Sequence, residues 1–141
     1  MPTEAPWHRG IHHGFLASAD RHPDASALRI AGADVSYAEL REQALGIAFA
    51  IASPTPESRF TAVFAHRTRA AYVGVLGAMC AGQGYVPIAP QFATERVVEM
   101  LDRTDARTIV VDAATVGRLP DVLANRPPTR VISPEVPLDD A

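Results

Sequence analysis

No lysine occurs among the 141 residues, because all 13 basic side chains are arginines. A phosphate-loop lysine, a Schiff-base lysine and a lysine general base are therefore excluded within this sequence. Cysteine is almost absent as well, and the single Cys80 excludes an internal disulfide and every metal motif that needs several cysteines. This cysteine usage fits a reducing compartment, and we expect a cytoplasmic protein.

Excess positive charge and long apolar runs are also missing. The formal net charge is −3 and no basic run occurs, so nothing drives counterion-release binding to nucleic acid. The most apolar stretch, residues 70–81, is too short to span a bilayer, and the first residues do not read as a signal peptide. We expect neither a nucleic-acid partner nor a membrane association.

What the chain does contain is typical of one globular domain with a core of small and branched side chains, since 48% of residues are apolar and only 6% are aromatic. Helix and strand patterns alternate, which favours an α/β fold: a parallel sheet with flanking helices, preceded by a small β-hairpin. We expect helices over residues 11–21, 36–52, 69–81, 94–104 and 113–123, hairpin strands over 27–30 and 34–36, and sheet strands over 61–65, 84–88, 108–111 and 129–132. A leader (residues 1–10) and an acidic, proline-containing tail (133–141) would flank the folded part, residues 11–132.

Ser36 and Glu39 have the spacing of a capping box, in which each side chain accepts a hydrogen bond from the backbone N–H of the other residue. The second helix should therefore begin here, and Pro120 should interrupt the last one. Helical spacing of apolar residues predicts the inner faces. The inner residues would be Leu40, Ala44, Ile47, Ala48 and Ile51 in the second helix, Ile11, Phe15 and Leu16 in the first, and Val97, Val98 and Leu101 in the fourth.

The histidines His8, His12 and His13 include an i, i+4 pair that could grip a divalent metal on a helix. Gly10 and Gly14 loosen the backbone there, and no carboxylate stands at a ligand spacing nearby. We therefore expect no metal site in this segment.

Other candidate residues also have simpler explanations. Cys80 lies near the end of an apolar helix without an activating partner, so we expect a buried small side chain rather than a nucleophile.

Gly82 and Gly84 resemble part of a dinucleotide-binding loop, but the order here is helix, turn, strand, whereas a phosphate loop needs strand, turn, helix. We interpret Gly82 as the residue that ends the helix and Pro87, which lacks a backbone N–H, as the mark of an edge strand or a bend out of the sheet.

Three aspartates, Asp102, Asp105 and Asp112, could be imagined as a carboxylate group. We place the first on a solvated helix face and the other two at turns, and we interpret all three as solvated charges. The residues thus predict no catalytic, cofactor-binding or metal-binding position in this chain.

Three segments carry a resemblance to a known family. Residues 35–40 (VSYAEL) resemble the first core motif of the adenylate-forming superfamily of AMP-dependent synthetases and ligases, L-[TS]-Y-x-E-L. Residues 79–89 (MCAGQGYVPIA) resemble the second motif, L-K-A-G-x-A-Y-V-P-[IL]-D. Residues 90–101 (PQFATERVVEML) are similar to the continuation P-x-x-P-x-E-R-x-x-x-M-L of nonribosomal-peptide-type adenylation domains. The chain departs from these patterns at Cys80, Gly84, Ala89 and Ala93.

The resemblance implies ATP and magnesium for a complete family enzyme but no cofactor in this chain alone. The family's glycine-rich phosphate loop, T-S-G-T-T-G-x-P-K-G, does not occur in the sequence, and neither does a catalytic lysine. We therefore carry over no catalytic residue.

Three functional hypotheses remain open. The chain could be the N-terminal fragment or split half of an ATP-dependent amino-acid- or acyl-adenylating enzyme, contributing packing and working with a complementary C-terminal polypeptide or a carrier protein. It could instead be a stand-alone interaction module that docks on a synthetase or carrier protein. A small independent α/β ligand-binding domain would leave the motifs unexplained. The acyl or amino-acid substrate does not follow from these residues.

Overall fold

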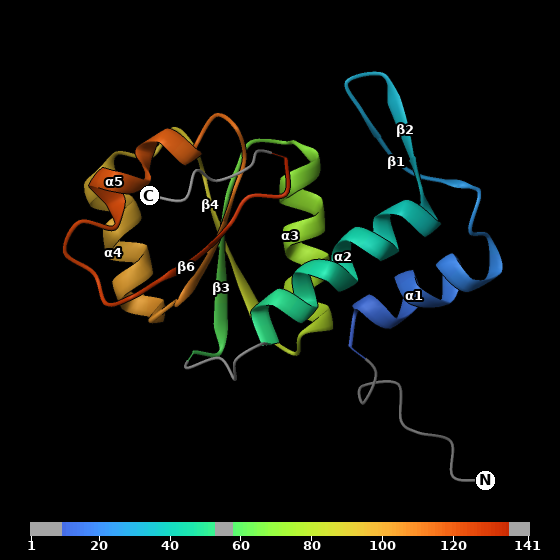
Figure 1. Cartoon of the computed structure of the whole chain (residues 1–141), viewed down its shortest axis with the longest axis horizontal. Helices are drawn as coiled ribbons and strands as arrows, with labels where there is room; N and C mark the ends of the chain where they lie inside the picture. Colours follow the sequence, from blue (N-terminus) through green and yellow to red (C-terminus); the bar gives the residue numbers. More distant parts are fainter. Residues whose placement is uncertain (1–9, 53–57, 136–141) are drawn as a thin grey trace, which may run out of the picture.

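The computed structural model describes residues 10–52 and 58–135. A four-stranded parallel sheet, in the order β4-β3-β5-β6, forms its centre, and a two-stranded antiparallel hairpin, β1-β2, stands apart from it (Figure 1). The elements are α1 (His12–Arg21), β1 (Ser26–Ile30), β2 (Ala33–Ser36), α2 (Tyr37–Ala52), β3 (Phe60–Phe64), α3 (Arg69–Cys80), β4 (Gly84–Ile88), α4 (Thr94–Thr104), β5 (Thr108–Val111), α5 (Leu119–Val122) and β6 (Arg130–Ile132). The expected α/β fold is confirmed.

Helices cover both faces of the sheet. The crossover from β3 to β4 passes through α3, and the crossover from β4 back to β5 passes through α4 in the opposite direction across the sheet. Because such crossovers are right-handed, α3 and α4 lie on opposite faces. Figure 1 shows α2 beside α3 on one face and α5 beside α4 on the other.

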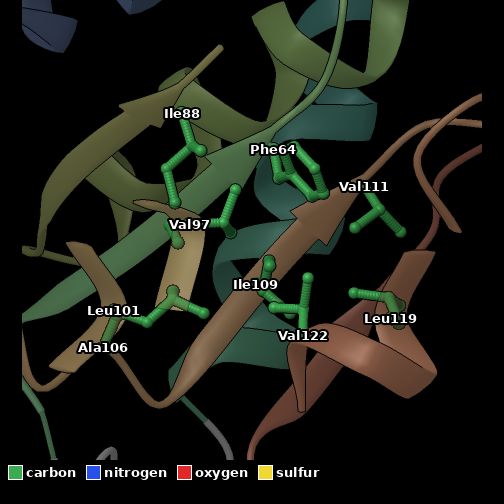
Figure 2. Close-up of a cluster of buried hydrophobic side chains, with 10 residues drawn as sticks. Phe64, Ile88, Val97, Leu101, Ala106, Ile109, Val111, Leu119 and Val122 are labelled. Carbon is green, nitrogen blue, oxygen red and sulfur yellow. The ribbon is translucent and has the colours of Figure 1, made fainter. Parts of the chain in front are cut away.

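Each face has its own apolar core. On the α4 and α5 face, Phe64 and Ile109 point from the sheet toward Val97, Leu101 and the residues of α5 (Figure 2). On the other face, side chains of α2 and α3 pack together with the hairpin. Fully burying one such side chain contributes about 1.5–3 kcal/mol, so the burial of these two clusters stabilises both faces of the sheet.

The start of α2 shows one half of the predicted capping box, since Ser36 N–H and the Glu39 carboxylate, both described by the structure, do not form the reciprocal hydrogen bond. The backbone N–H of Glu39 donates to the hydroxyl of Ser36 at 3.2 Å, and the helix begins at the next residue, Tyr37. The buried residues of this helix are those that the apolar spacing predicted: Leu40, Ala44, Ile47, Ala48 and Ile51.

Glycine permits the close approach of α2 and α3. A Cβ at Gly77 would lie 2.6 Å from Cγ2 of Ile47 and 3.1 Å from the backbone oxygen of Ala44. Beyond the end of α3, Gly82 adopts a φ of 76°, a conformation that favours glycine. The predicted role of Gly82 in ending the helix is confirmed.

Some details differ from the sequence-based expectations. Ile11 precedes α1 and is 88% exposed, and the buried residue of this helix is Ala19. Val98 is only half-buried. Residues 113–123 form no single helix: a 3-10 helix (Val116–Arg118) leads into α5, and Pro120 lies in the first turn of α5. Proline is accommodated there because its missing N–H would have no partner within the helix.

Residues 1–9 and 136–141, which make up most of the expected leader and tail, lie outside the described residues. None of the described helices is long and apolar enough to cross a bilayer.

Candidate functional site at the carboxyl edge of the sheet

Strands β3 and β5 are adjacent and parallel, and the connections that leave them lead toward opposite edges of the sheet. From β3 the chain passes to β4 on one side, and from β5 it passes to β6 on the other. Phe64 and Val111, the last residues of the two strands, are paired. In open α/β sheets, the crevice beyond the carboxyl ends of strands at such a switch point is where ligands bind. This edge is therefore the candidate site.

A buried carboxylate, Asp112, joins the two loops that leave these strands. It is 1% exposed. Its Oδ2 accepts hydrogen bonds from the backbone N–H of His66 at 2.7 Å and from the hydroxyl of Thr68 at 3.3 Å. Its Oδ1 accepts from the backbone N–H groups of Ala114 at 3.0 Å and Thr115 at 2.9 Å. Nδ1 of the half-exposed His66 ring lies 3.3 Å from Oδ2.

These hydrogen bonds determine the charge state of Asp112. Burial alone would raise the pKa of this carboxyl, but the hydrogen bonds from His66 and Thr115 outweigh desolvation and hold its pKa below the ordinary value. Asp112 is therefore an anion near neutral pH. Because both oxygens are already engaged, the group serves as an anchor for two loops and not as an available general base or metal ligand.

Thr115 completes the connection between the strand ends. Its Oγ1 accepts from the backbone N–H of Asp112 at 3.1 Å and donates to the carbonyl oxygen of Phe64 at 2.6 Å. The loop after β5 is thereby tied to the end of β3.

The N-terminus of α3 faces the same edge and is cationic in character. Thr68 occupies the N-cap position without a side-chain cap, and its hydroxyl donates to Asp112 instead. The backbone N–H of Ala70 donates to Oε1 of Glu135 at 3.2 Å. Residues 66–69 (HRTR) include two arginines, Arg67 and Arg69, and the first turn of α3 has no acidic residue. The two arginines add to the partial positive charge of the helix end.

A groove lies between α3 and the segment that follows β4, and we name it the α3–β4 groove. It consists of two adjoining hollows of about 450 Å³ and about 320 Å³. The hollows share a lining of small apolar residues: Ala65, Ala71, Val75 and Ala89. The larger is also lined by His66, Arg67, Tyr72 and Gln91, and the smaller by Val63, Pro87 and Phe92.

Arg118 holds the far wall of this groove. Its guanidinium donates to the carbonyl oxygen of Pro90 at 2.5 Å and to that of Phe92 at 2.7 Å. The same group lies 5.0 Å from the centroid of the Phe64 ring, within the range of a cation–π interaction. The β4–α4 loop is therefore fixed by a charged side chain, as the β3–α3 loop is by Asp112.

The structure corrects the interpretation of the three aspartates. Asp112 is not a solvated charge but the buried centre of the site, because three backbone N–H groups compensate its desolvation. Asp102 is exposed and pairs with Arg126, and Asp105 pairs with Arg107 at 3.0 Å. The three carboxylates form no group.

The remaining candidates lie away from this edge. The rings of His12 and His13 pack edge to face with centroids 4.5 Å apart, and His8 lies outside the described residues. Among residues 10–52 and 58–135, no three His, Cys, Asp or Glu side chains are placed to share a metal ion. Cys80 is partly buried, and burial raises the pKa of its thiol, which disfavours the reactive thiolate.

Pro87 lies in β4, an edge strand of the described sheet, as predicted. Between Gly82 and Gly84, the side chain of Gln83 accepts a hydrogen bond from the hydroxyl of Thr61 at 2.6 Å and donates to the carbonyl oxygen of Ser58 at 2.9 Å. These contacts tie the turn to the amino end of β3, so its role is structural.

Sequence reasoning considered Asp112 but interpreted it as a solvated charge, and it missed His66 and Arg118. A signal for the first two was present, because each is a polar residue close behind an apolar strand, and parallel strands end at the same edge. For Arg118 the sequence holds no comparable signal, since its partners are backbone carbonyl groups 26 and 28 positions away.

Comparisons with known proteins show which family and which proteins this chain is similar to. The profile of the AMP-binding enzyme family matches residues 15–140. The AMB antimetabolite synthetase AmbB of Pseudomonas aeruginosa is 39% identical over 120 residues, which are 84% of this chain and 10% of AmbB. Tyrocidine synthase 3 of Brevibacillus parabrevis is 30% identical over 118 residues, covering 83% of this chain and 2% of that protein.

Among solved structures, the crystal structure of IdnL7 matches with a TM-score of 0.83 and 34% identity, over 92% of this chain and 26% of IdnL7. The chain thus spans a tenth or less of these curated relatives and about a quarter of IdnL7.

Proposed function

This chain belongs to the AMP-binding enzyme family, and from that premise we propose that it is the N-terminal structural part of an adenylation domain, packing against the segments that bind ATP and the acyl or amino-acid substrate. The observation that carries this proposal is the extent of the match. The family profile covers residues 15–140, and the fold agrees with IdnL7 over 92% of this chain but only 26% of IdnL7.

The chemistry of adenylation supports a non-catalytic role for this part alone. Forming an acyl-adenylate requires donors for the triphosphate, a magnesium site and a cation that stabilises charge at the reacting phosphate. The sequence contains no lysine and no copy of the family's phosphate loop.

ATP and magnesium do not fit the described edge of the sheet. Its buried carboxylate, Asp112, accepts hydrogen bonds on both oxygens, so neither oxygen is available to a cation. We therefore assign the nucleotide site to the remainder of the domain, in the same polypeptide or in a complementary one. A carrier protein is a further candidate partner of the completed domain.

The isolated chain should associate with itself. Phe49 is 76% exposed and Tyr85 is also exposed, and β4 and β6 are unpaired edges of the described sheet. Exposed apolar surface and open strand edges favour aggregation. Gel filtration of the chain alone should show oligomers or aggregates.

Co-expression tests the proposed role. The chain would be produced together with the part of IdnL7 that it does not match, and the two should co-purify in a 1:1 complex. A sharp monomer peak of the chain alone, with a cooperative thermal transition and no complex, would contradict this role and favour the stand-alone interaction module. In neither case should the chain alone catalyse substrate-dependent exchange of pyrophosphate into ATP.

A further inference from the structure

We propose that the α3–β4 groove is the docking site for an apolar polypeptide segment bearing a carboxylate, supplied by the remainder of the adenylation domain. This inference rests on the proposed function and deepens it, since it names the surface and the chemistry of the contact.

The groove exists because helices cover only part of one sheet face. On this face, Ile132 of β6 packs with the α2 and α3 cluster, and Gly74 of α3 lies directly over Val110 of β5, where a Cβ would come within 2.9 Å. Val63 of β3 and Pro87 of β4 line the smaller hollow instead. The sheet face beside α3 therefore offers space for one more packed segment.

The walls of the groove are held in place independently of any partner. Asp112 fixes the β3–α3 loop through His66 and Thr68, and Arg118 fixes the β4–α4 loop through Pro90 and Phe92. Of the residues in these two loops, Phe92 alone packs against one of the two apolar cores. A recognition surface whose walls are already ordered loses less conformational entropy on binding.

Charge at one end of the groove selects the chemistry of the partner. His66 and Arg67 line the larger hollow, and Arg69 begins α3 beside them. Arg67 makes no hydrogen bond or ion pair with any residue that the structure describes. The chain as a whole carries a net charge of −3, so this cationic end is a local feature. Two carboxylates already contact this end of α3, Asp112 through His66 and Thr68 and Glu135 through the backbone N–H of Ala70. Arg67 is therefore the cation that a carboxylate on the partner would pair with.

The open shape of the groove favours a polypeptide over a small molecule. The two hollows adjoin through four shared residues, and both are open to solvent. Small-molecule sites instead enclose most of the ligand. IdnL7 also contains further polypeptide from which such a segment could come, because this chain corresponds to only 26% of IdnL7.

The co-expression described above becomes a test of the groove when variants are added. Val75→Glu places a charge in the shared apolar lining, and Arg67→Glu reverses the charge at the cationic end. Phe49→Glu is the matched control, because Phe49 is an exposed apolar residue of α2 that does not line the groove. Circular dichroism of each complex or free chain verifies that the fold is retained. Since Arg67 is exposed, its variant keeps the test valid even if Val75→Glu misfolds.

We expect Val75→Glu and Arg67→Glu to lower the affinity for the IdnL7 remainder at least about tenfold, a typical loss for a central interface residue, while Phe49→Glu binds as the wild type does. If wild type and groove variants bind equally, the groove is not the docking site and the proposed function still stands. If only Phe49→Glu loses binding, the contact lies on α2 and the inference is overturned. If the wild type does not bind, the proposed function fails and this inference fails with it.

Discussion

Replacing Asp112 tests whether the hydrogen bonds to its carboxylate stabilise the loops at the carboxyl edge of the sheet. In Asp112→Ala, the backbone N–H groups of His66, Ala114 and Thr115 lose their acceptor. A buried N–H without a partner costs about 1–3 kcal/mol, and less where water can replace the partner. Thr115 is buried, whereas His66 and Ala114 are exposed. We therefore expect Asp112→Ala to lower the free energy of unfolding by about 3 kcal/mol, and Asp112→Asn, which retains one oxygen, by about 2 kcal/mol.

The pH dependence gives this prediction a second readout. The folded-state pKa of Asp112 lies below its ordinary value, so its stabilising contribution is fully present above the unfolded-state pKa of about 4 and is lost as pH falls through the folded-state pKa. Urea unfolding followed by circular dichroism, at two protein concentrations, should show a difference between wild type and Asp112→Asn at pH 7 that shrinks below about pH 4. Equal stabilities at pH 7, or a difference independent of pH, would refute the reasoning.

Three further predictions concern the scaffold. Ser36→Ala should lower the free energy of unfolding by about 1 kcal/mol, because the cap of α2 is lost; an unchanged denaturation midpoint would show that the helix does not depend on this cap. Gly77→Ala should lower it by about 1–3 kcal/mol, since the new methyl group would collide with Ile47. Gly46→Ala, in the same helix pair but with nothing within 4 Å of its Cβ, should be neutral or stabilising, and equal effects of both changes would contradict the packing argument. Arg118→Met should speed hydrogen exchange at the backbone amides of the β4–α4 loop, and unchanged exchange would show that the guanidinium does not hold that loop.

The sequence predicted the architecture well because local signals agreed with tertiary packing. The α2 cap, the inner face of α2 and the glycine that ends α3 each depend on residues close together in the chain. Predictions failed where a local pattern was incomplete. Ile11 has helical spacing with Phe15, but it precedes α1 and is 88% exposed. Pro120 was expected to interrupt a helix, yet it is compatible with the first turn of one.

The site was far less predictable than the fold. The charge state of Asp112 depends on donors from a loop 46 positions earlier, and its burial follows from the pairing of β3 with β5. A sequence pattern alone describes an aspartate after a strand as a turn residue exposed to water. Only the parallel register, which brings the ends of both strands to one edge, distinguishes a buried anchor from a solvated charge.

The central claim is that this chain supplies the structural beginning of an adenylation domain and depends on the remainder of that domain for chemistry. The most direct test replaces the matched quarter of IdnL7 with this chain and measures substrate-dependent exchange of pyrophosphate into ATP by the purified chimera and by the chain alone. The account predicts exchange well above background for the chimera and none for the chain alone. Exchange by the isolated chain, purified free of host synthetases, or a folded chimera without exchange, would contradict the claim.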